Sequence, residues 1–291
     1  MKNKHVIFSA LMAIAVSFSM TACNKSNSID TSVPAGQEHL SLYLTDGPGL
    51  FDKVLIDIRS VKVLIDTSKD TRRHDNEDWD RRCENDQKKD SSFIWTNLNI
   101  RAGVYDILSL RNGVDTLLAA VGITKGSIRV IKIELGTNNS VVKDSITYPV
   151  FLPPNAPNYI VIKLKGDECH EYLPGKKQLW LDFDITRSII QESNNKFYLR
   201  PVIHFFTVNT TGGIIGKVTP KEGYPVVTVY NEKDTAYAIP NKDGYFKIRG
   251  LKNGTYSVLI NASNGYADTT ISHVVVAAPK ESSVGLIILH K

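Results

Sequence analysis

Short alternations of apolar and polar residues recur along almost the whole chain, whereas helical periodicity is nearly absent. The runs are rich in β-branched residues and are separated by Gly, Pro, Asn and Asp, which is typical of an all-β sandwich or barrel. Val114–Val121 is expected to form the only short helix. In the first two thirds of the chain, strands are predicted at His39–Thr45, Lys53–Ile65, Ser127–Leu135, Tyr148–Leu152, Tyr159–Lys165, Gln178–Ile185 and Phe197–Val208.

The pattern changes after Thr210-Thr211-Gly212-Gly213, which we interpret as a linker. The expected fold class is therefore all-β, with two antiparallel β-sandwich domains at residues 38–209 and 213–291. The C-terminal domain is expected to hold seven shorter strands, at Ile214–Val218, Val226–Asn231, Thr235–Ile239, Tyr245–Ile248, Gly254–Asn261, Thr269–Val276 and Ser283–Leu289.

The N-terminus carries the pattern of an export signal. Two lysines precede an apolar run, Val6–Met20, and Ala22 stands directly before Cys23. The run is shorter than the about 20 apolar residues that a membrane-spanning helix needs, and its flanks are those of a signal peptide. Cys23 after small residues resembles the lipobox of bacterial lipoproteins, which implies removal of residues 1–22 and lipidation of Cys23. A plain secretory signal with a coincidental cysteine is the alternative.

Residues 23–37 are polar and are expected to form a flexible tether between the lipid and the folded part. Several acyl chains together hold a protein stably on a membrane. The expected location is therefore the bacterial cell envelope, at the outer membrane, with the periplasmic and surface faces both open.

The balance of charge gives no sign of a nucleic-acid partner. The chain has 35 Lys and Arg against 30 Asp and Glu, and loss of residues 1–22 removes Lys2 and Lys4 but no acidic residue. The remaining excess of about +3 is too mild for nucleic-acid binding, and no basic block alternates with aromatic residues.

Beyond Cys23 the chain has two cysteines, Cys83 and Cys169. An even pair in an exported protein suggests a disulfide. A bridge that closes so long a loop would stabilise the fold by roughly 3–5 kcal/mol. The alternatives are two free thiols, or a metal site that also uses His170.

Residues 67–92 are densely charged with both signs and almost lack apolar side chains. A loop of this length is either functional or loosely ordered. It lacks the glycine and the closing glutamate of an EF-hand, so a solvated loop is favoured over a calcium loop. Trp79 within it either covers a sheet edge or is presented to a partner as a binding anchor.

The C-terminal domain carries a long motif of turns and core positions. Asp243-Gly244 and Asn253-Gly254 predict two tight turns, while Phe246 and Tyr256 point to the core. The motif resembles the regulatory domain of carboxypeptidases, which is a transthyretin-like (prealbumin-like) sandwich. The resemblance implies a seven-stranded and mostly non-catalytic module at 213–291. The related fold group includes starch-binding modules, although no residue here marks a sugar site.

The N-terminal domain also carries a resemblance. Leu42–Pro48, Val54–Val63, Trp180–Asp184 and Leu199–Ile203 resemble a domain of unknown function found in bacterial lipoproteins. This resemblance implies a β-sandwich and an envelope role, and it offers no catalytic residues.

The predicted strand Gln178–Ile185 holds the candidate ligand site. With a period of two residues, Trp180, Asp182 and Asp184 share one face of this strand. An indole beside two carboxylates could stack on a sugar ring and bind its hydroxyl groups. The alternative, which is favoured, places Trp180 under a loop and leaves the acids in solvent. A glycosidase pair is the least favoured interpretation.

Asp46 precedes Gly-Pro at the end of a predicted strand and is expected to accept backbone N–H groups in the turn. Together with Asp52 it is also a candidate calcium ligand, since calcium prefers clustered oxygen atoms. His74, His170 and His204 lack metal-binding spacing, and His204 is expected to be a packed strand residue. No nucleophile motif or phosphate loop is present.

These observations favour a non-catalytic cell-envelope lipoprotein that acts as a ligand- or carbohydrate-binding module. The alternative is a structural or assembly subunit of a surface or uptake complex, whose β-edges pair with other chains. Metal-dependent hydrolysis that uses Asp182 or His170 is the third and least favoured hypothesis. The expected partners are the membrane and a glycan or an envelope protein. No cofactor is expected, with calcium as the one alternative.

Overall fold

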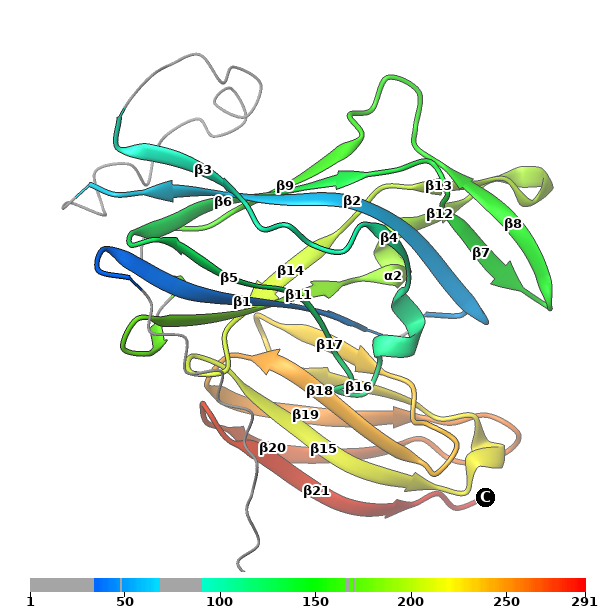
Figure 1. Cartoon of the computed structure of the whole chain (residues 1–291). Helices are drawn as coiled ribbons and strands as arrows, with labels where there is room; N and C mark the ends of the chain where they lie inside the picture. Colours follow the sequence, from blue (N-terminus) through cyan, green and yellow to red (C-terminus); the bar gives the residue numbers. More distant parts are fainter. Residues whose placement is uncertain (1–33, 48, 69–90, 166–167, 170) are drawn as a thin grey trace, which may run out of the picture. The chain divides into compact units, whose positions relative to one another are not determined.

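Strands account for most of the chain in the computed structural model, as the alternating sequence predicts (Figure 1). The structure describes residues 34–47, 49–68, 91–165, 168–169 and 171–291. They belong to one compact unit, Val33–Lys291. No helix in this part of the chain has the length and apolar character needed to cross a membrane.

A five-stranded sheet forms the first layer of the N-terminal sandwich. Its central strand β1 (Gln37–Asp46) pairs in parallel with β11 (Lys176–Phe183) and antiparallel with β5 (Thr116–Thr124). The other side of β11 carries β10 (Glu171–Leu173) and β14 (Ile203–Phe206).

A nine-stranded sheet forms the second layer, and its main path runs in the order β12-β13-β8-β7-β2-β6-β9. The long strand β2 also pairs with β3 and β4. The bounds are β2 (Lys53–Asp66), β3 (Phe93–Asn97), β4 (Gly103–Asp106), β6 (Ser127–Leu135), β7 (Ser140–Lys143), β8 (Ile146–Phe151), β9 (Tyr159–Lys163), β12 (Ile189–Gln191) and β13 (Phe197–Leu199).

The apolar positions of the two layers form one core. In the five-stranded sheet, Leu42 lies beside Leu179 and Leu44 beside Leu181, and all four are at most 1% exposed. Alternate residues of β2, including Val61 and Val63, join the same core. The period-two pattern of these strands therefore predicts correctly which side chains are buried.

Two predicted segments of the N-terminal sandwich differ from the structure. Val114–Val121 is not a helix, because most of it belongs to β5, whose pairing with β1 outweighs the helical preference of its leucines and alanines. Phe197–Val208 is two strands, β13 and β14, that are separated at Pro201. Within the described ranges, the short helices are η1 (Ile107–Leu110), α2 (Ile185–Ser188), η2 (Ser193–Asn195) and η3 (Lys221–Gly223).

The C-terminal sandwich has the seven strands that the sequence predicts. A three-stranded sheet of order β18-β15-β21 packs against a four-stranded sheet of order β17-β16-β19-β20. Gly212 and Gly213 begin β15 and are not part of a linker, so the connection between the sandwiches is shorter than expected. The bounds are β15 (Gly212–Thr219), β16 (Val226–Tyr230), β17 (Thr235–Ala238), β18 (Tyr245–Leu251), β19 (Gly254–Asn261), β20 (Thr269–Val276) and β21 (Glu281–Ile288).

The described strands pair antiparallel except at three places, where β1 meets β11, β8 meets β13 and β15 meets β21. Phe246 and Tyr256 are buried in the C-terminal core as predicted, at 0% and 1% exposure. The Tyr256 hydroxyl donates to the carbonyl of Lys252 at 3.0 Å, so the only polar atom of this side chain is satisfied.

The predicted turn at Asp243-Gly244 is stereochemically demanding. Gly244 has a φ of +80°, and a Cβ atom there would lie 2.2 Å from the carbonyl oxygen of Val218. We expect Gly244→Ala to lower the free energy of unfolding by about 1–3 kcal/mol, because it adds a clash to backbone strain. Chemical denaturation measures this loss. The matched control is Gly265→Ala, since Gly265 has a φ of +78° and open space at its Cβ position. Equal losses in both variants would contradict the role of the clash.

Candidate functional site

The outer face of the five-stranded sheet carries most of the candidate site. This face lies opposite the core, and strand pairing brings residues of β1, β11 and β14 into rows across it. One row is aromatic, the next is polar, and the two adjoin. The rows are Tyr43, Trp180 and Phe206, and then Thr45, Asp182 and His204.

The aromatic row forms a stack in which Trp180 is the middle ring. Its centroid lies 4.8 Å from that of Tyr43 and 5.9 Å from that of Phe206, and the rings are nearly parallel. Trp180 is only 8% exposed. Both faces of the indole are covered, so this tryptophan does not offer an open ring to a sugar. The interpretation that Trp180 is covered fits this geometry, but its second part does not, because Oδ1 of Asp182 is buried and not in solvent.

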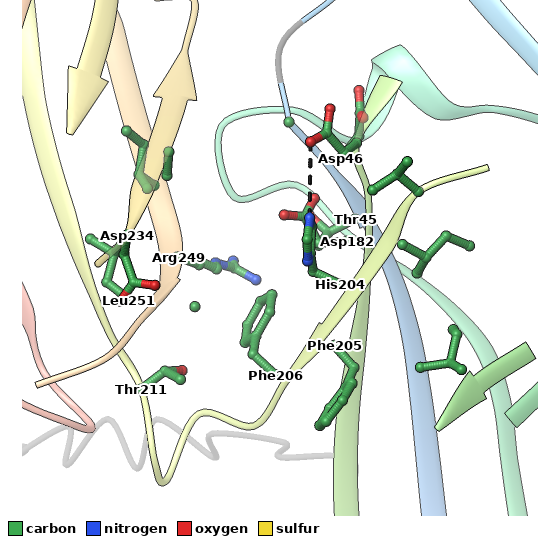
Figure 2. Close-up of a pocket in the computed structure, with 18 of the residues that line it drawn as sticks. Thr45, Asp46, Asp182, His204, Phe205, Phe206, Thr211, Asp234, Arg249 and Leu251 are labelled. Carbon is green, nitrogen blue, oxygen red and sulfur yellow. Dashed lines mark ion pairs between the residues drawn. The ribbon is translucent and has the colours of Figure 1, made fainter. Parts of the chain in front are cut away.

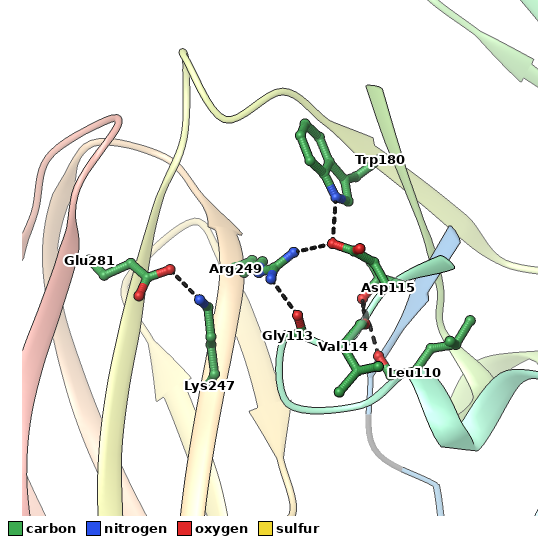
Figure 3. A network of polar contacts seen from close by, with 9 residues as sticks. Leu110, Gly113, Val114, Asp115, Trp180, Lys247, Arg249 and Glu281 are labelled. Atoms are coloured by element: carbon green, nitrogen blue, oxygen red, sulfur yellow. Dashed lines mark hydrogen bonds and ion pairs between the residues drawn. The ribbon is translucent and has the colours of Figure 1, made fainter. Parts of the chain in front are cut away.

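A loop at residues 111–115, called the docking loop below, links this row to the C-terminal sandwich (Figure 3). The indole N–H of Trp180 donates to Asp115 Oδ2 at 3.0 Å, and Arg249 of β18 donates to the same oxygen at 2.8 Å. Arg249 also donates to the carbonyl of Gly113. One carboxylate thus joins the two sandwiches.

Two further contacts fix the docking loop. Thr45 Oγ1 donates toward the carbonyls of Val114, at 3.0 Å, and Leu110. On the other side, Asn112 Nδ2 donates to the carbonyl of Ile239 at 3.0 Å. The loop is therefore held by side chains of both sandwiches.

Three of the predicted site residues come together at the polar row and just past its strand ends: Asp46, Asp182 and Asp184, called the acidic group below. Asp46 ends β1 and is 7% exposed, and apart from the backbone N–H of Ile185, which acts to lower its pKa, its carboxyl oxygens have no hydrogen-bond partner among the described residues. Oδ1 of Asp182 is buried without a partner there. The expectation that Asp46 accepts backbone N–H groups is thus met only in part, by the backbone N–H of Ile185.

Asp184 is a partly buried member of the acidic group, with 24% of its side chain exposed. Its Oδ1 accepts the backbone N–H of Arg187 at 3.0 Å and so caps helix α2. Its Oδ2 lies 3.8 Å from the Arg187 guanidinium and 3.9 Å from His204 Nε2. The side chain of His204 is 55% exposed, so the expectation that it is packed is wrong.

Burial and mutual repulsion change the protonation of the acidic group. Desolvation, followed by the charge of Asp182, raises the pKa of Asp46 to about 10, and Arg111 opposes this rise. Desolvation, followed by the charge of Asp184, raises the pKa of Asp182 to about 6. At pH 7 Asp46 therefore keeps its proton.

A cleft of about 1410 Å³ opens between the two sandwiches beside the acidic group. Figure 2 shows Asp46, Asp182 and His204 on one side and Asp234, Arg249 and Leu251 on the other. The cleft is lined by parts of β9, β14, β17 and β18. Acidic, basic and apolar groups thus meet on one concave surface.

The predicted calcium pair is not assembled. Asp52 accepts the backbone N–H of Ser145 at 3.0 Å, whereas the charges that act on Asp46 are those of Asp182, Asp184 and Arg111. In the described part of the chain, no three His, Cys, Asp or Glu side chains form a group that could hold a metal ion. Calcium binding by Asp46 and Asp52 stays a prediction.

Cys169 is a buried cysteine with a free thiol, and burial raises its pKa to about 11. A thiol of this kind is poorly reactive at neutral pH. Its predicted partner Cys83 lies outside the described residues, so the disulfide stays a prediction. Cys23, Trp79 and His170 also lie outside them, and lipidation, the tryptophan anchor and the histidine metal site stay predictions as well.

The sequence did not identify His204, Phe206 and Arg249 as site residues. Alternation within β14 places His204 and Phe206 on one face, which was a usable signal. Arg249 had no such signal, because its contact with Asp115 spans 134 positions of the chain.

A family profile described as "Domain of unknown function (DUF4382)" matches residues 37–201. The chain belongs to this family. The match covers the N-terminal sandwich from β1 to β13 and therefore includes the acidic group. It agrees with the resemblance seen in the sequence. Among curated proteins, no relative of this DUF4382 chain is found.

Solved structures give weak likenesses to the DUF4382 chain. A type II cohesin–X-dockerin complex from Acetivibrio cellulolyticus matches with 24% identity over 27% of this chain and 56% of that one, at a TM-score of 0.22. The shaft pilin SpaA from Lactobacillus rhamnosus GG matches with 11% identity over 87% of this chain and 98% of that one, at a TM-score of 0.22. The Bacillus anthracis TIE protein matches with 8% identity over 87% of this chain and 35% of that one, at a TM-score of 0.23. The chain spans about half the length of the first of these matches.

Proposed function

We propose that this DUF4382 protein is a non-catalytic recognition module of the bacterial cell envelope, anchored through a lipid on Cys23. Its ligand site is the cleft between the sandwiches. The observation that supports this proposal is the acidic group beside the cleft, in which Oδ1 of Asp182 is buried without a hydrogen-bond partner among the described residues and Asp46 has only the backbone N–H of Ile185. Buried polar atoms are normally paired, and exceptions are common at functional sites.

The two sandwiches contribute to the site together. His204 and Phe206 come from β14, while Arg249 and Leu251 come from β18, and all four line the cleft. The docking loop fixes one sandwich against the other through Asp115 and Arg249. A cleft whose two walls are held in place is preorganised, which lowers the entropic cost of binding.

The test compares ligand binding by the wild type with binding by a variant whose cleft is filled. A soluble form that begins at residue 24 is applied to an array of glycans and to a random peptide library, with and without calcium. His204→Trp adds a large ring in the cleft at an exposed position, so binding of any specific ligand should fall at least tenfold. Ile146→Trp is the matched control, because Ile146 is 54% exposed and lies outside the cleft. Equal binding by His204→Trp and wild type would refute the cleft as the ligand site.

A further inference from the structure

Each of the four sheets presents an edge strand to the cleft. Among the described strands, β9 pairs only with β6, β14 only with β11, β17 only with β16 and β18 only with β15. All four edge strands contribute lining residues. The cleft is thus lined by four edge strands, each of which pairs with a neighbouring described strand on one side only.

Strand β14 exposes its backbone to the cleft. All of its residues, Ile203–Phe206, line the cleft, although side chains alternate between the two faces of a strand. Successive lining residues indicate that the strand turns its edge toward the cleft. The N–H of Asp184 donates to the carbonyl of Val202, and alternation along an antiparallel pair then directs the polar backbone groups of Ile203 and Phe205 away from β11. An edge of this kind is a template for another strand.

The acidic group lies next to this edge. His204 of β14 is the register partner of Asp182, and Asp46 lines the same cleft. Asp46 is 7% exposed, and the backbone N–H of Ile185 is the one group among the described residues that donates toward its two carboxyl oxygens. Leaving buried polar oxygens unpaired is costly, and an ammonium or guanidinium group from a ligand would satisfy them. A cation there would also favour the ionised form of Asp46, whose pKa burial has raised.

We propose that the cleft binds an extended segment of a partner protein, which adds a strand to the open edge of β14 and places a lysine or arginine side chain against Asp46 and Asp182. The inference deepens the proposed function and rests on it, since it names the ligand class of the same cleft. In this mode, backbone hydrogen bonds give affinity, and pockets for alternate side chains give specificity.

The surroundings of β14 favour a peptide over a glycan. The indole of Trp180 is covered on both faces by Tyr43 and Phe206, so it gives a sugar ring nothing on which to stack. Tyr237 of β17 is 51% exposed and lines the cleft, where it can pack against an apolar side chain of the added strand. The charge of the acidic group complements a basic side chain.

The experiment selects peptides from a random nine-residue library displayed on phage, using the soluble chain from residue 24 and removing peptides that also bind His204→Trp. We expect the selected peptides to share one lysine or arginine flanked by alternating apolar residues. Replacing that residue with norleucine should weaken binding at least tenfold. In the double variant Asp46→Asn with Asp182→Asn, the lysine and norleucine peptides should bind equally.

Strand addition has its own readout, which is methylation of single backbone nitrogens of the best peptide. N-methylation should abolish binding at alternate positions only, because successive N–H groups of a strand point in opposite directions. Circular dichroism and thermal melting of each variant check that the fold is retained.

The outcomes separate the two proposals. Cleft-dependent peptides without a basic residue, or without an alternating response to N-methylation, would overturn strand addition and leave the cleft as a binding site. Glycans that bind wild type but not His204→Trp, with no selected peptides, would also overturn it. Absence of any ligand that depends on the cleft would overturn the proposed function itself.

Discussion

Trp180→Ala should lower the free energy of unfolding by about 3–5 kcal/mol, which is the usual cost of truncating a large buried aromatic side chain. The variant loses the stack with Tyr43 and Phe206 and the hydrogen bond to Asp115. Asp115 Oδ2 would then accept a hydrogen bond from Arg249 but none from residue 180, so the docking loop should also be held less firmly. Urea denaturation monitored by circular dichroism measures the loss.

Trp180→Phe is the control for this prediction, because it keeps a stacking ring and removes the indole N–H. We expect it to cost no more than about half of the loss in Trp180→Ala, since a single hydrogen bond to a charged group contributes about 1.5–3 kcal/mol. A Trp180→Ala protein as stable as wild type would mean that the ring is not packed between the sandwiches. The large effect on folding also makes Trp180→Ala unsuitable as a test of binding.

Asp46→Asn should make the protein more stable at pH 8 than wild type, and the gain should shrink as the pH falls toward 4. Burial, helped by the charges of Asp182 and Asp184 and opposed by Arg111, raises the pKa of Asp46 to about 10. The folded state therefore holds a proton that the unfolded chain releases above pH 3.8, the ordinary value. The contribution of Asp46 to the free energy of unfolding is therefore largest below pH 3.8. It decreases as the pH rises toward 10, by at most about 1.4 kcal/mol per pH unit.

Denaturation curves of both proteins between pH 4 and pH 9 measure the difference. Asp52→Asn is the matched control, because Asp52 is exposed and is not among the groups whose charges shift the pKa of Asp46. If Asp46→Asn destabilised the protein equally at every pH, the native carboxyl would be ionised and partnered. That result would also weaken the case for a basic side chain of a ligand at this position.

Local sequence determined the elements of the C-terminal sandwich well. Turn dipeptides such as Asp243-Gly244 separate its strands, and alternation predicts that Phe246 is buried. The same reasoning failed for Val114–Val121, whose leucines and alanines favour a helix locally. Pairing with β1, more than seventy positions away, makes most of this segment a strand. Tertiary contacts of this kind leave no local signal.

The candidate site could be predicted only in part for the same reason. Alternation placed Trp180 and Asp182 on the outer face of their strand, as the structure has them. What covers that face comes from distant segments, namely the docking loop and Arg249. The meeting of Asp46 with Asp182 depends on the parallel pairing of β1 with β11, which are separated by more than a hundred positions. The residues that flank Asp46 and Asp182 in the sequence therefore predict neither that the two acids lie close together nor that they are buried.

The parallel pairing of β15 with β21 has a mechanical consequence. Gly213 pairs with Glu281 at one end of the two strands, and Thr219 pairs with Ile288 at the other. A force that pulls the start of β15 away from the end of β21 therefore runs along both strands in opposite directions. It loads all their hydrogen bonds at once in shear, whereas an antiparallel pair pulled from one end would open bond by bond. We therefore expect the pair of β15 and β21 to resist tension applied between Gly212 and Ile288.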